Sequence, residues 1–244
     1  MALTAETIKQ IRALHSPKGR AESRLFIAEG VRTIATFIEA SFVPQALYVA
    51  SNKLELLAHL PAHLSVESIP ARQMESISAS SSPSGILAVF SLPAEPPLSK
   101  LSEGIVLAQV TDPGNMGTLI RSAVAFGYKT VVIIEGCDPY SPKVVQATAG
   151  SLAHVQLFRL SWDELVKNKK DLSLCALVAR EGKQPEELNL SKTLLVVGNE
   201  AHGLPDQWVT DCDTHLTLPM RGNVESLNAG VAGSIALFLA SVQK

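Results

Sequence analysis

Three stretches of the sequence combine glycines and asparagines with a few charged residues, a composition that suits a polar organic ligand needing little charge chemistry. They are TDPGNMGTLIR (111–121), GNEAHGLP (198–205) and LPMRGNVESLN (218–228). Glycine lets a ligand approach the backbone, and asparagine both donates and accepts hydrogen bonds. Asn115 can lie in a loop while Arg121, six residues later, projects from the following helix toward the same crevice. Taken singly, either residue is more often structural, as a helix cap or a surface ion pair.

Several common catalytic motifs are absent from the sequence. No GxGxxG follows the strand before Asn115, which removes the dinucleotide-binding signature. Gly198 and Gly203 are followed by Leu204-Pro205 instead of the Lys-Ser/Thr pair that a P-loop needs to bind phosphate and magnesium. There is no GxSxG nucleophile turn and no HExxH zinc motif.

The histidines and cysteines do not form a pattern typical of a metal site. None of them stands at the short, repeated spacing that metal ligands need. The residues concerned are His154, His202, His215, Cys137, Cys175 and Cys212. We therefore expect no metal, and we expect the three cysteines to be reduced thiols of a cytosolic protein.

Length, charge and hydropathy describe an ordinary soluble protein. The chain has 244 residues, enough for one large or two smaller domains, and its net charge of −2 gives no global reason to bind a polyanion. No window approaches 18 consecutive apolar residues, and the N-terminus MALTAETIKQ lacks the apolar segment of a signal peptide. We expect a cytoplasmic protein without a membrane partner.

The second part of the chain alternates apolar runs with helix-compatible segments, which predicts an α/β fold with a mostly parallel sheet covered on both faces. The runs are GIVLAQV (104–110), TVVIIEG (130–136), HVQLFRL (154–160), LSLCALVA (172–179), KTLLVVGNE (192–200) and THLTLPM (214–220). The segments between them include 117–127 and 141–153. Since functional loops of such folds lie at the carboxyl ends of strands, the three polar stretches belong there.

The C-terminal segment predicts an unusually thin helix. Its apolar stripe of helical period comprises Leu227, Val231, Ile235, Phe238 and Leu239. Small residues fill the positions between them, and two glycines in a helix indicate that another backbone approaches closely. Either this is simply a buried helix with Ser226 or Asn223 as N-cap, or its polar first turn and the preceding loop line a ligand site.

Prolines divide the chain. SLPAEPPLSK (91–100) cannot continue a helix or a central strand, so we predict a linker at 93–101 between domains at 1–92 and 102–244. The first domain mixes helices at 4–16, 31–40 and 52–60 with strands at 24–30, 44–50 and 85–92. Its first 32 residues are basic and form either a solvated face or a phosphate-binding patch; the basic residues are Lys9, Arg12, Lys18, Arg20, Arg24 and Arg32.

Three motifs together resemble those of the SpoU, or TrmH-like, RNA methyltransferases of the SPOUT superfamily. They are NMGTLIRSAVAFG, LLVVGNEAHGLP and LPMRGNVESLNAGVAGSIALF, and the likeness spans 105–244. More loosely, SPKGRAESRLFIAEGVRTIATFIEA resembles the L30e-like substrate-binding domain of the ribosomal-RNA members. Ala201-His202 departs from the family pattern, at positions that are usually small or acidic.

The resemblance implies transfer of a methyl group from S-adenosylmethionine to a ribose 2′-hydroxyl of RNA, with ribosomal RNA favoured over transfer RNA. It implies a homodimer through the catalytic domain and a deep trefoil knot that holds the cofactor. The implied cofactor residues are Gly198, Asn199, Glu200, Gly203, Leu218, Met220, Ser226 and Leu227. The implied catalytic residues are Arg121, Asn115, Glu200, Ser226 and Asn228. The expected RNA contacts are Lys18, Arg20, Arg24 and Arg121.

The role of Arg121 stays open between two chemistries. The resemblance suggests a general base for the hydroxyl, whereas an arginine side chain hardly ever loses its proton at neutral pH. Binding of an RNA phosphate or of developing alkoxide is the alternative, and we favour the phosphate. A non-catalytic RNA-binding protein of the same fold has no need of all five catalytic residues, and a hydrolase lacks a nucleophile-base pair in the sequence.

Overall fold

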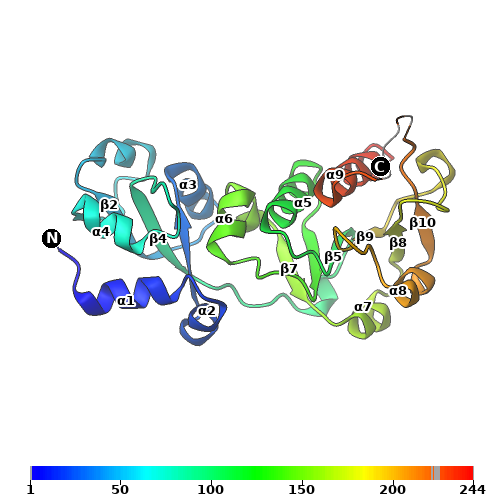
Figure 1. Ribbon diagram of the computed structural model, residues 1–244, viewed down its shortest axis with the longest axis horizontal. Helices are drawn as coiled ribbons and strands as arrows, with labels where there is room; N and C mark the ends of the chain where they lie inside the picture. Colours follow the sequence, from blue (N-terminus) through cyan, green and yellow to red (C-terminus); the bar gives the residue numbers. More distant parts are fainter. Residues whose placement is uncertain (1, 221, 223–225, 244) are drawn as a thin grey trace. The chain divides into compact units, whose positions relative to one another are not determined.

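The computed structural model describes residues 2–220, 222 and 226–243, which form two compact units (Figure 1). The first unit contains 1–93 together with 138–153, and the second contains 94–137 together with 154–244. The segment 138–153 thus belongs by its contacts to the first unit, although the strands on either side of it in sequence belong to the second. The sequence division at 93–101 did not foresee this exchange.

The first unit is built on a four-stranded mixed sheet in the order β1-β4-β2-β3. β4 pairs antiparallel with β1 and β2, and β2 pairs parallel with β3. The strands are β1 (Leu25–Glu29), β2 (Pro44–Ala50), β3 (Glu67–Ile69) and β4 (Ile86–Ser91). The helices are α1 (Ala5–Ala13), α2 (Pro17–Ser23), α3 (Val31–Glu39), α4 (Ala71–Ile77), α6 (Pro142–Thr148) and the 3₁₀ helix η1 (Leu54–His59).

Most elements expected in the first unit are present. The Thr4 hydroxyl caps α1 by accepting a hydrogen bond from the Thr7 amide at 3.1 Å, as its position before the helix predicts. The helix expected at 52–60 is a 3₁₀ helix, and the short elements α2, β3 and α4 were not predicted. α6 packs against β1, with the Phe26 and Tyr140 rings 5.0 Å apart.

The second unit has a six-stranded parallel sheet in the order β10-β8-β9-β5-β6-β7, which confirms the predicted sheet. The strands are β5 (Gly104–Ala108), β6 (Thr130–Ile134), β7 (Gln156–Arg159), β8 (Ser173–Leu177), β9 (Thr193–Val197) and β10 (Thr214–Leu216). The helices are α5 (Pro113–Ala125), α7 (Trp162–Asn168), α8 (Asp206–Asp211), α9 (Ala229–Ser241) and the 3₁₀ helices η2 (Leu98–Lys100), η3 (Ser151–His154, shared with the first unit) and η4 (Pro185–Glu187).

The central strands of this sheet are buried on both faces. Every residue of β5, β6 and β9 is buried, as expected for strands covered on both faces. The chain runs from β5 outward to β7 and then crosses to β8 beyond β9, so that the strand order reverses between β5 and β9. Such a reversal point is where open α/β sheets bind ligands.

The knot and the absence of a membrane span were the other expectations for the fold. The trefoil knot remains a prediction, because the chain between β10 and α9 includes 221 and 223–225, which lie outside the described residues. Within the described part of the chain, no helix has both the length and the apolar character needed to cross a bilayer.

Candidate active site

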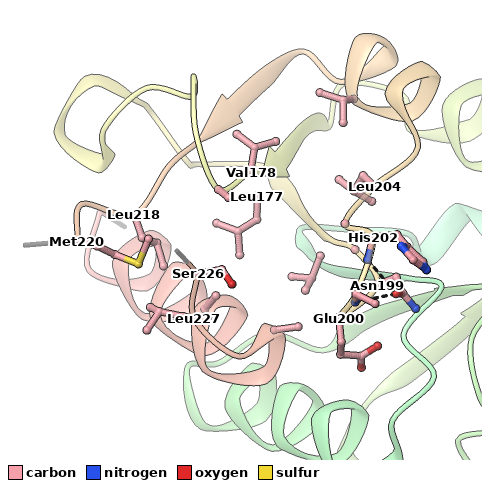
Figure 2. Close-up of a pocket in the computed structure, with 18 residues that line it drawn as sticks. Leu177, Val178, Asn199, Glu200, His202, Leu204, Leu218, Met220, Ser226 and Leu227 are labelled. Atoms are coloured by element: carbon pink, nitrogen blue, oxygen red, sulfur yellow. Dashed lines mark hydrogen bonds between the residues drawn. The ribbon is translucent and has the colours of Figure 1, made fainter. Parts of the chain in front are cut away.

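A cavity of about 440 Å³ lies at the carboxyl ends of β8 and β9 (Figure 2). Its size falls in the range of small-molecule sites, roughly 300–1,000 Å³. Leu177 and Val178 at the end of β8 line one part of the cavity, and the loop that begins with Gly198 lines the part beside them. The cavity is completed by Leu218 and Ser226, from the stretch before α9. Apolar side chains and loop backbone thus form most of its wall.

The loop after β9 has little conformational freedom. Asn199 and Gly203 exchange two backbone hydrogen bonds, both 3.0 Å long, and Gly203 has a positive φ of +69°. A Cβ added to Gly198 would lie 2.5 Å from the Gly203 carbonyl carbon, so only glycine fits there. The Asn199 side chain donates to the Gln109 carbonyl at 2.9 Å and accepts from the Ala201 amide at 2.9 Å. This loop is therefore held in one shape.

All the residues expected to contact the cofactor line this one cavity. They are Gly198, Asn199, Glu200, Gly203, Leu218, Met220, Ser226 and Leu227. His202, where the family pattern changes, also lines it, as do Leu177 and Val178, which the sequence reasoning missed. Those two residues are at the end of an apolar run, and only their place beside β9 in the sheet distinguishes them from core residues.

Two of the expected catalytic residues are joined by a hydrogen bond. The Asn115 side-chain amide donates to Glu200 Oε1 at 2.9 Å, and Asn115 is only 8% exposed. Asp112 positions Asn115, since its carboxylate caps α5 by accepting the Asn115 backbone N–H at 2.7 Å. The Asp-Pro pair before a helix is an N-cap signature that could have identified Asp112 from the sequence.

Asn228 lies near this pair. The amide oxygens of Asn115 and Asn228 would lie 3.0 and 3.1 Å from a Cβ placed on Gly230, so the glycine allows the two asparagines to come together. Asn228 Oδ1 also accepts the Val231 N–H at 3.2 Å, which makes Asn228 the N-cap of α9. The expected cap at Ser226 was wrong, because the helix begins only at Ala229. The alternative cap Asn223 and the neighbouring Glu225 lie outside the described residues.

Arg121, like Asn115 and Asn228, does not line the cavity. It is exposed on α5, about two turns beyond Asn115. This position agrees with a side chain that meets the substrate and not the cofactor.

The thin helix α9 packs its small residues inward. It lies beside α5 (Figure 1), and the hydroxyls of Ser122 and Ser234 are 2.7 Å apart. A Cβ on Gly233 would come within 2.4 Å of the Leu119 side chain, so glycine permits a close approach here, although by a side chain and not by the backbone that the sequence predicted. The apolar stripe faces outward instead: Val231 and Phe238 are each 47% exposed.

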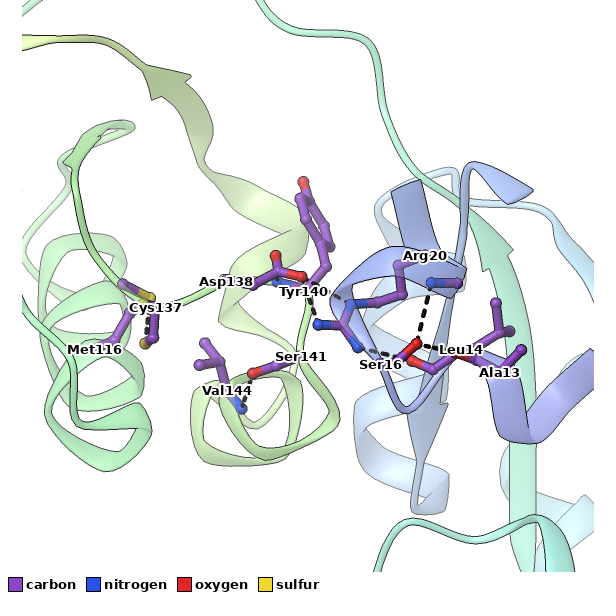
Figure 3. A network of polar contacts seen from close by, with 11 residues as sticks. Ala13, Leu14, Ser16, Arg20, Met116, Cys137, Asp138, Tyr140, Ser141 and Val144 are labelled. Carbon is purple, nitrogen blue, oxygen red and sulfur yellow. Dashed lines mark hydrogen bonds and ion pairs between the residues drawn. The ribbon is translucent and has the colours of Figure 1, made fainter. Parts of the chain in front are cut away.

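The expected RNA contacts in the first unit divide into exposed and buried residues. Lys18 and Arg24 are exposed. Arg20 is 2% exposed, and its guanidinium binds Asp138 at 2.6 Å and donates to the Leu14 carbonyl at 2.7 Å (Figure 3). The assignment of Arg20 to RNA is therefore corrected: its charge is already paired inside the unit and holds the segment 138–153.

Burial also perturbs two groups away from the cavity. Burial, together with nearby Cys175 and acidic groups, raises the pKa of the Cys212 thiol to about 12. Burial likewise raises the pKa of Tyr128 to about 12, with a contribution from Glu103. Neither group lines the cavity. Among the described residues, no cluster of three or more histidine, cysteine or acidic side chains could hold a metal ion.

Comparison with known proteins yields two family matches and close structural relatives. Residues 104–238 match the SpoU rRNA Methylase family, and residues 5–88 match the MRM3-like substrate binding domain. The 23S rRNA (guanosine(2553)-2'-O)-methyltransferase RlmP of Bacillus subtilis is 25% identical over 96% of this chain and 95% of its own.

Two solved structures match over almost the whole chain. A putative RNA methyltransferase of the TrmH family from Porphyromonas gingivalis has 30% identity and a TM-score of 0.86, covering 98% of both chains. The AdoMet-bound rRNA methyltransferase from Sinorhizobium meliloti has 26% identity and a TM-score of 0.85, covering 98% of this chain and 95% of its own.

Proposed function

Because the chain belongs to the SpoU rRNA methylase family, we propose that it transfers the methyl group of S-adenosylmethionine to a ribose 2′-hydroxyl of ribosomal RNA. The observation that carries this proposal is the convergence of two distant parts of the sequence, the loop 198–203 and the residues Leu218, Met220, Ser226 and Leu227, on one cavity beside the Asn115–Glu200 hydrogen bond. We also propose that the protein acts in the cytoplasm.

The cavity fits S-adenosylmethionine in its chemistry. Leu177, Leu204 and Leu218 offer apolar surface for an adenine ring, and the glycines at 198 and 203 leave backbone groups accessible to the polar parts of the cofactor. The bound cofactor supplies an already activated methyl group on a sulfonium. The protein's task is then to align the ribose oxygen with that methyl group and to stabilise the charge that develops on the oxygen.

In the proposed reaction the O2′–methyl bond forms while the sulfur–methyl bond breaks, and the hydroxyl proton is lost to solvent. S-adenosylhomocysteine is the second product. Asn115, held by Glu200, and Asn228 beside it offer amide groups that can orient the ribose. Ser226 lines the cavity and completes the polar wall. Arg121 binds the phosphate next to the target ribose through its two parallel N–H groups.

We further propose that the chain forms a homodimer through α9. Leu227, Val231, Ile235, Phe238 and Val242 form one outward apolar stripe, and each is between 37% and 63% exposed. A contiguous apolar face of this kind marks an interface. The family resemblance favours a second copy of this chain as the partner.

Light scattering at micromolar concentration tests this assembly. We expect a dimer for the native chain and a monomer for the double variant Val231→Asp/Phe238→Asp. Val43→Asp is the matched control, because Val43 is 73% exposed but lies in the first unit. A native monomer, or a dimer unaffected by the double change, would contradict the proposed interface.

Mapping of 2′-O-methylation across total RNA, with and without the gene, tests the function. We expect one or a few ribosomal RNA positions to lose their methyl group. Loss confined to transfer RNA would assign the alternative substrate class, and no loss, combined with no methyl transfer by the purified chain, would favour the non-catalytic alternative.

A further inference from the structure

A second cavity, of about 330 Å³, lies entirely within the first unit. Three segments that are distant in sequence form it: β1, the serine-rich loop after α4, and the start of α6. The lining residues are Ile27, Glu29, Ala79, Ser80, Ser81, Pro142, Lys143 and Gln146. Neither the proposed cofactor site nor the proposed RNA contacts use any of these residues.

Glu29 is a buried carboxylate whose hydrogen bonding is incomplete. The side chain is on the same face of β1 as Ile27, and the residue is 8% exposed. Oε2 accepts the Ser78 hydroxyl at 2.5 Å, and Oε1 accepts the Ala79 amide at 2.8 Å. An ionised carboxylate has about four lone-pair sites, so each oxygen keeps one acceptor position after these two bonds. Two neighbouring acceptors are thus available to a ligand.

The rest of the cavity limits what that ligand can be. Lys143 is exposed and brings a positive charge that suits an anion. Pro142 offers apolar surface for a flat ring, beside the buried Ile27. Ser81 and Gln146 add groups that can hydrogen-bond a sugar or a phosphate. The matching ligand has an apolar ring, two parallel N–H donors and a negative charge.

We propose that this cavity binds an unpaired guanine nucleotide of the RNA substrate. Guanine presents N1–H and N2–H side by side on its Watson–Crick edge, which matches the two free acceptor positions of Glu29. The other three bases lack two adjacent ring-edge donors in this arrangement. Proteins read sequence in RNA mainly through such unpaired bases and their Watson–Crick edges. Lys143 pairs with the phosphate of the same nucleotide.

An arginine side chain of a partner protein also has two parallel donors, but its positive charge would meet Lys143. The nucleotide therefore fits the charges better. The inference rests on the proposed RNA methyltransferase function in one respect: the guanine is taken to belong to the RNA that is methylated.

The test measures binding of guanosine 5′-monophosphate to the full chain by saturation-transfer NMR, with S-adenosylhomocysteine in excess to occupy the cofactor cavity. We expect GMP to bind at least tenfold more tightly than AMP, CMP or UMP. Equal binding of all four nucleotides, or stronger binding of N-acetylarginine amide than of GMP, overturns the proposal.

Two variants locate the binding. Glu29→Gln keeps the shape of the side chain but replaces one acceptor oxygen by an N–H donor group. It should weaken GMP binding at least tenfold. Its control is Glu39→Gln, an exposed carboxylate at the end of α3. Because Lys143 is exposed, Lys143→Ala leaves the core intact. It should weaken the binding of GMP severalfold and leave the binding of uncharged guanosine unchanged. Unchanged GMP binding in Lys143→Ala overturns the site, and this result can be measured even if Glu29→Gln proves unstable.

Methyl transfer to ribosomal RNA by the native chain is measured in parallel. Methyl transfer without GMP binding overturns only the guanine pocket. GMP binding that depends on Glu29 without methyl transfer supports the pocket and contradicts the proposed function.

Discussion

The cavity at the ends of β8 and β9 and the cavity beside β1 each contain one carboxylate that holds a loop, yet they are built in opposite ways. Glu200 accepts from Asn115 and lies in a cavity formed largely by glycine backbone and apolar side chains. Glu29 accepts from Ser78 and Ala79 and lies among polar side chains of three separate segments. Glycines and asparagines at fixed spacing make the first site visible in sequence, whereas Glu29 ends an ordinary strand, LFIAE. A site built from backbone leaves a motif, and one built from side chains of distant segments does not.

The charged residues of the two units differ in the same way. Arg121 is exposed in the unit that has the cofactor cavity, while Arg20 is buried in the other and paired with Asp138. From the sequence, we expected both arginines to contact RNA. Burial thus distinguishes the structural Arg20 from Arg121, for which an RNA contact is proposed. The following predictions test this distinction, beginning with the largest effect.

Arg121→Ala should lower methyl transfer by roughly 1,000-fold, at the upper end of what loss of one charge-stabilising group costs. Cofactor affinity should stay within about twofold, because Arg121 does not line the cavity. Single-turnover methyl transfer and calorimetry with S-adenosylhomocysteine measure the two quantities. A large loss of cofactor affinity would show that Arg121 reaches the cofactor.

Arg121→Lys then separates the two roles of the residue. If Arg121 binds phosphate through two parallel N–H groups, lysine should give poor transfer from about pH 6.5 to about pH 9.5 together with weakened RNA binding. A lysine with an ordinary pKa near about 10.4 should instead recover activity as the pH rises, if proton removal is the main role. Recovery with normal RNA binding would contradict the phosphate assignment.

Arg20→Ala should destabilise the first unit by about 3 kcal/mol, a factor of roughly 150 in its folding equilibrium, because it leaves Asp138 without its charged partner. Chemical denaturation measures the change. Lys18→Ala is the control: Lys18 is exposed and only 3.8 Å from Glu22, so its loss should cost less than about 0.5 kcal/mol. Equal effects of the two variants would refute the structural role of Arg20.

Gly198→Ala should weaken cofactor binding by at least about tenfold, because a Cβ 2.5 Å from the Gly203 carbonyl carbon forces the loop to move. A free-energy cost of about 1.4 kcal/mol for this movement already corresponds to a factor of about 10 in affinity. Gly222→Ala, where nothing lies within 4 Å of the added Cβ, is the matched control. Calorimetry with S-adenosylmethionine decides the outcome. Normal affinity in Gly198→Ala would mean that the backbone of this loop does not form the site.

Lys18→Ala combined with Arg24→Ala should produce the smallest effect, a flatter salt dependence of RNA affinity. Each lost phosphate contact reduces the slope by about 0.7 for single-stranded RNA, so the pair should reduce it by about 1.4. Filter binding across a salt series measures it, with Lys167→Ala/Lys170→Ala in the second unit as control. An unchanged slope would place the RNA on another surface.

The exchange of 138–153 between units changes how the domains can be separated. The proline-rich linker alone suggests a catalytic fragment that begins near residue 99. The structure shows that this fragment would carry α6 without the strand β1 it packs on, and would expose Tyr140, Val144 and Val145. Activity and cofactor binding are therefore best tested on the full chain.

The sequence by itself determined the parallel sheet and the loops that line the proposed cofactor cavity. Near-continuous runs of valine, isoleucine and leucine are required in strands buried on both faces, as in β5 and β9. Gly198 is required where the Gly203 backbone approaches, Gly203 has a positive φ, and Gly230 and Gly233 leave room for neighbouring side chains, so glycines in the sequence point to these positions.

Only the tertiary structure decided which polar and apolar residues are buried. Arg20 and Arg24 are four residues apart in the same basic segment, but one faces Asp138 and the other faces solvent. The apolar stripe of α9 faces outward because Gly230 and Gly233 let the opposite face lie against α5 and β9. Helical period gives the spacing of a stripe but not the side on which a neighbour lies, and burial of a charge depends on a partner that is 118 residues away.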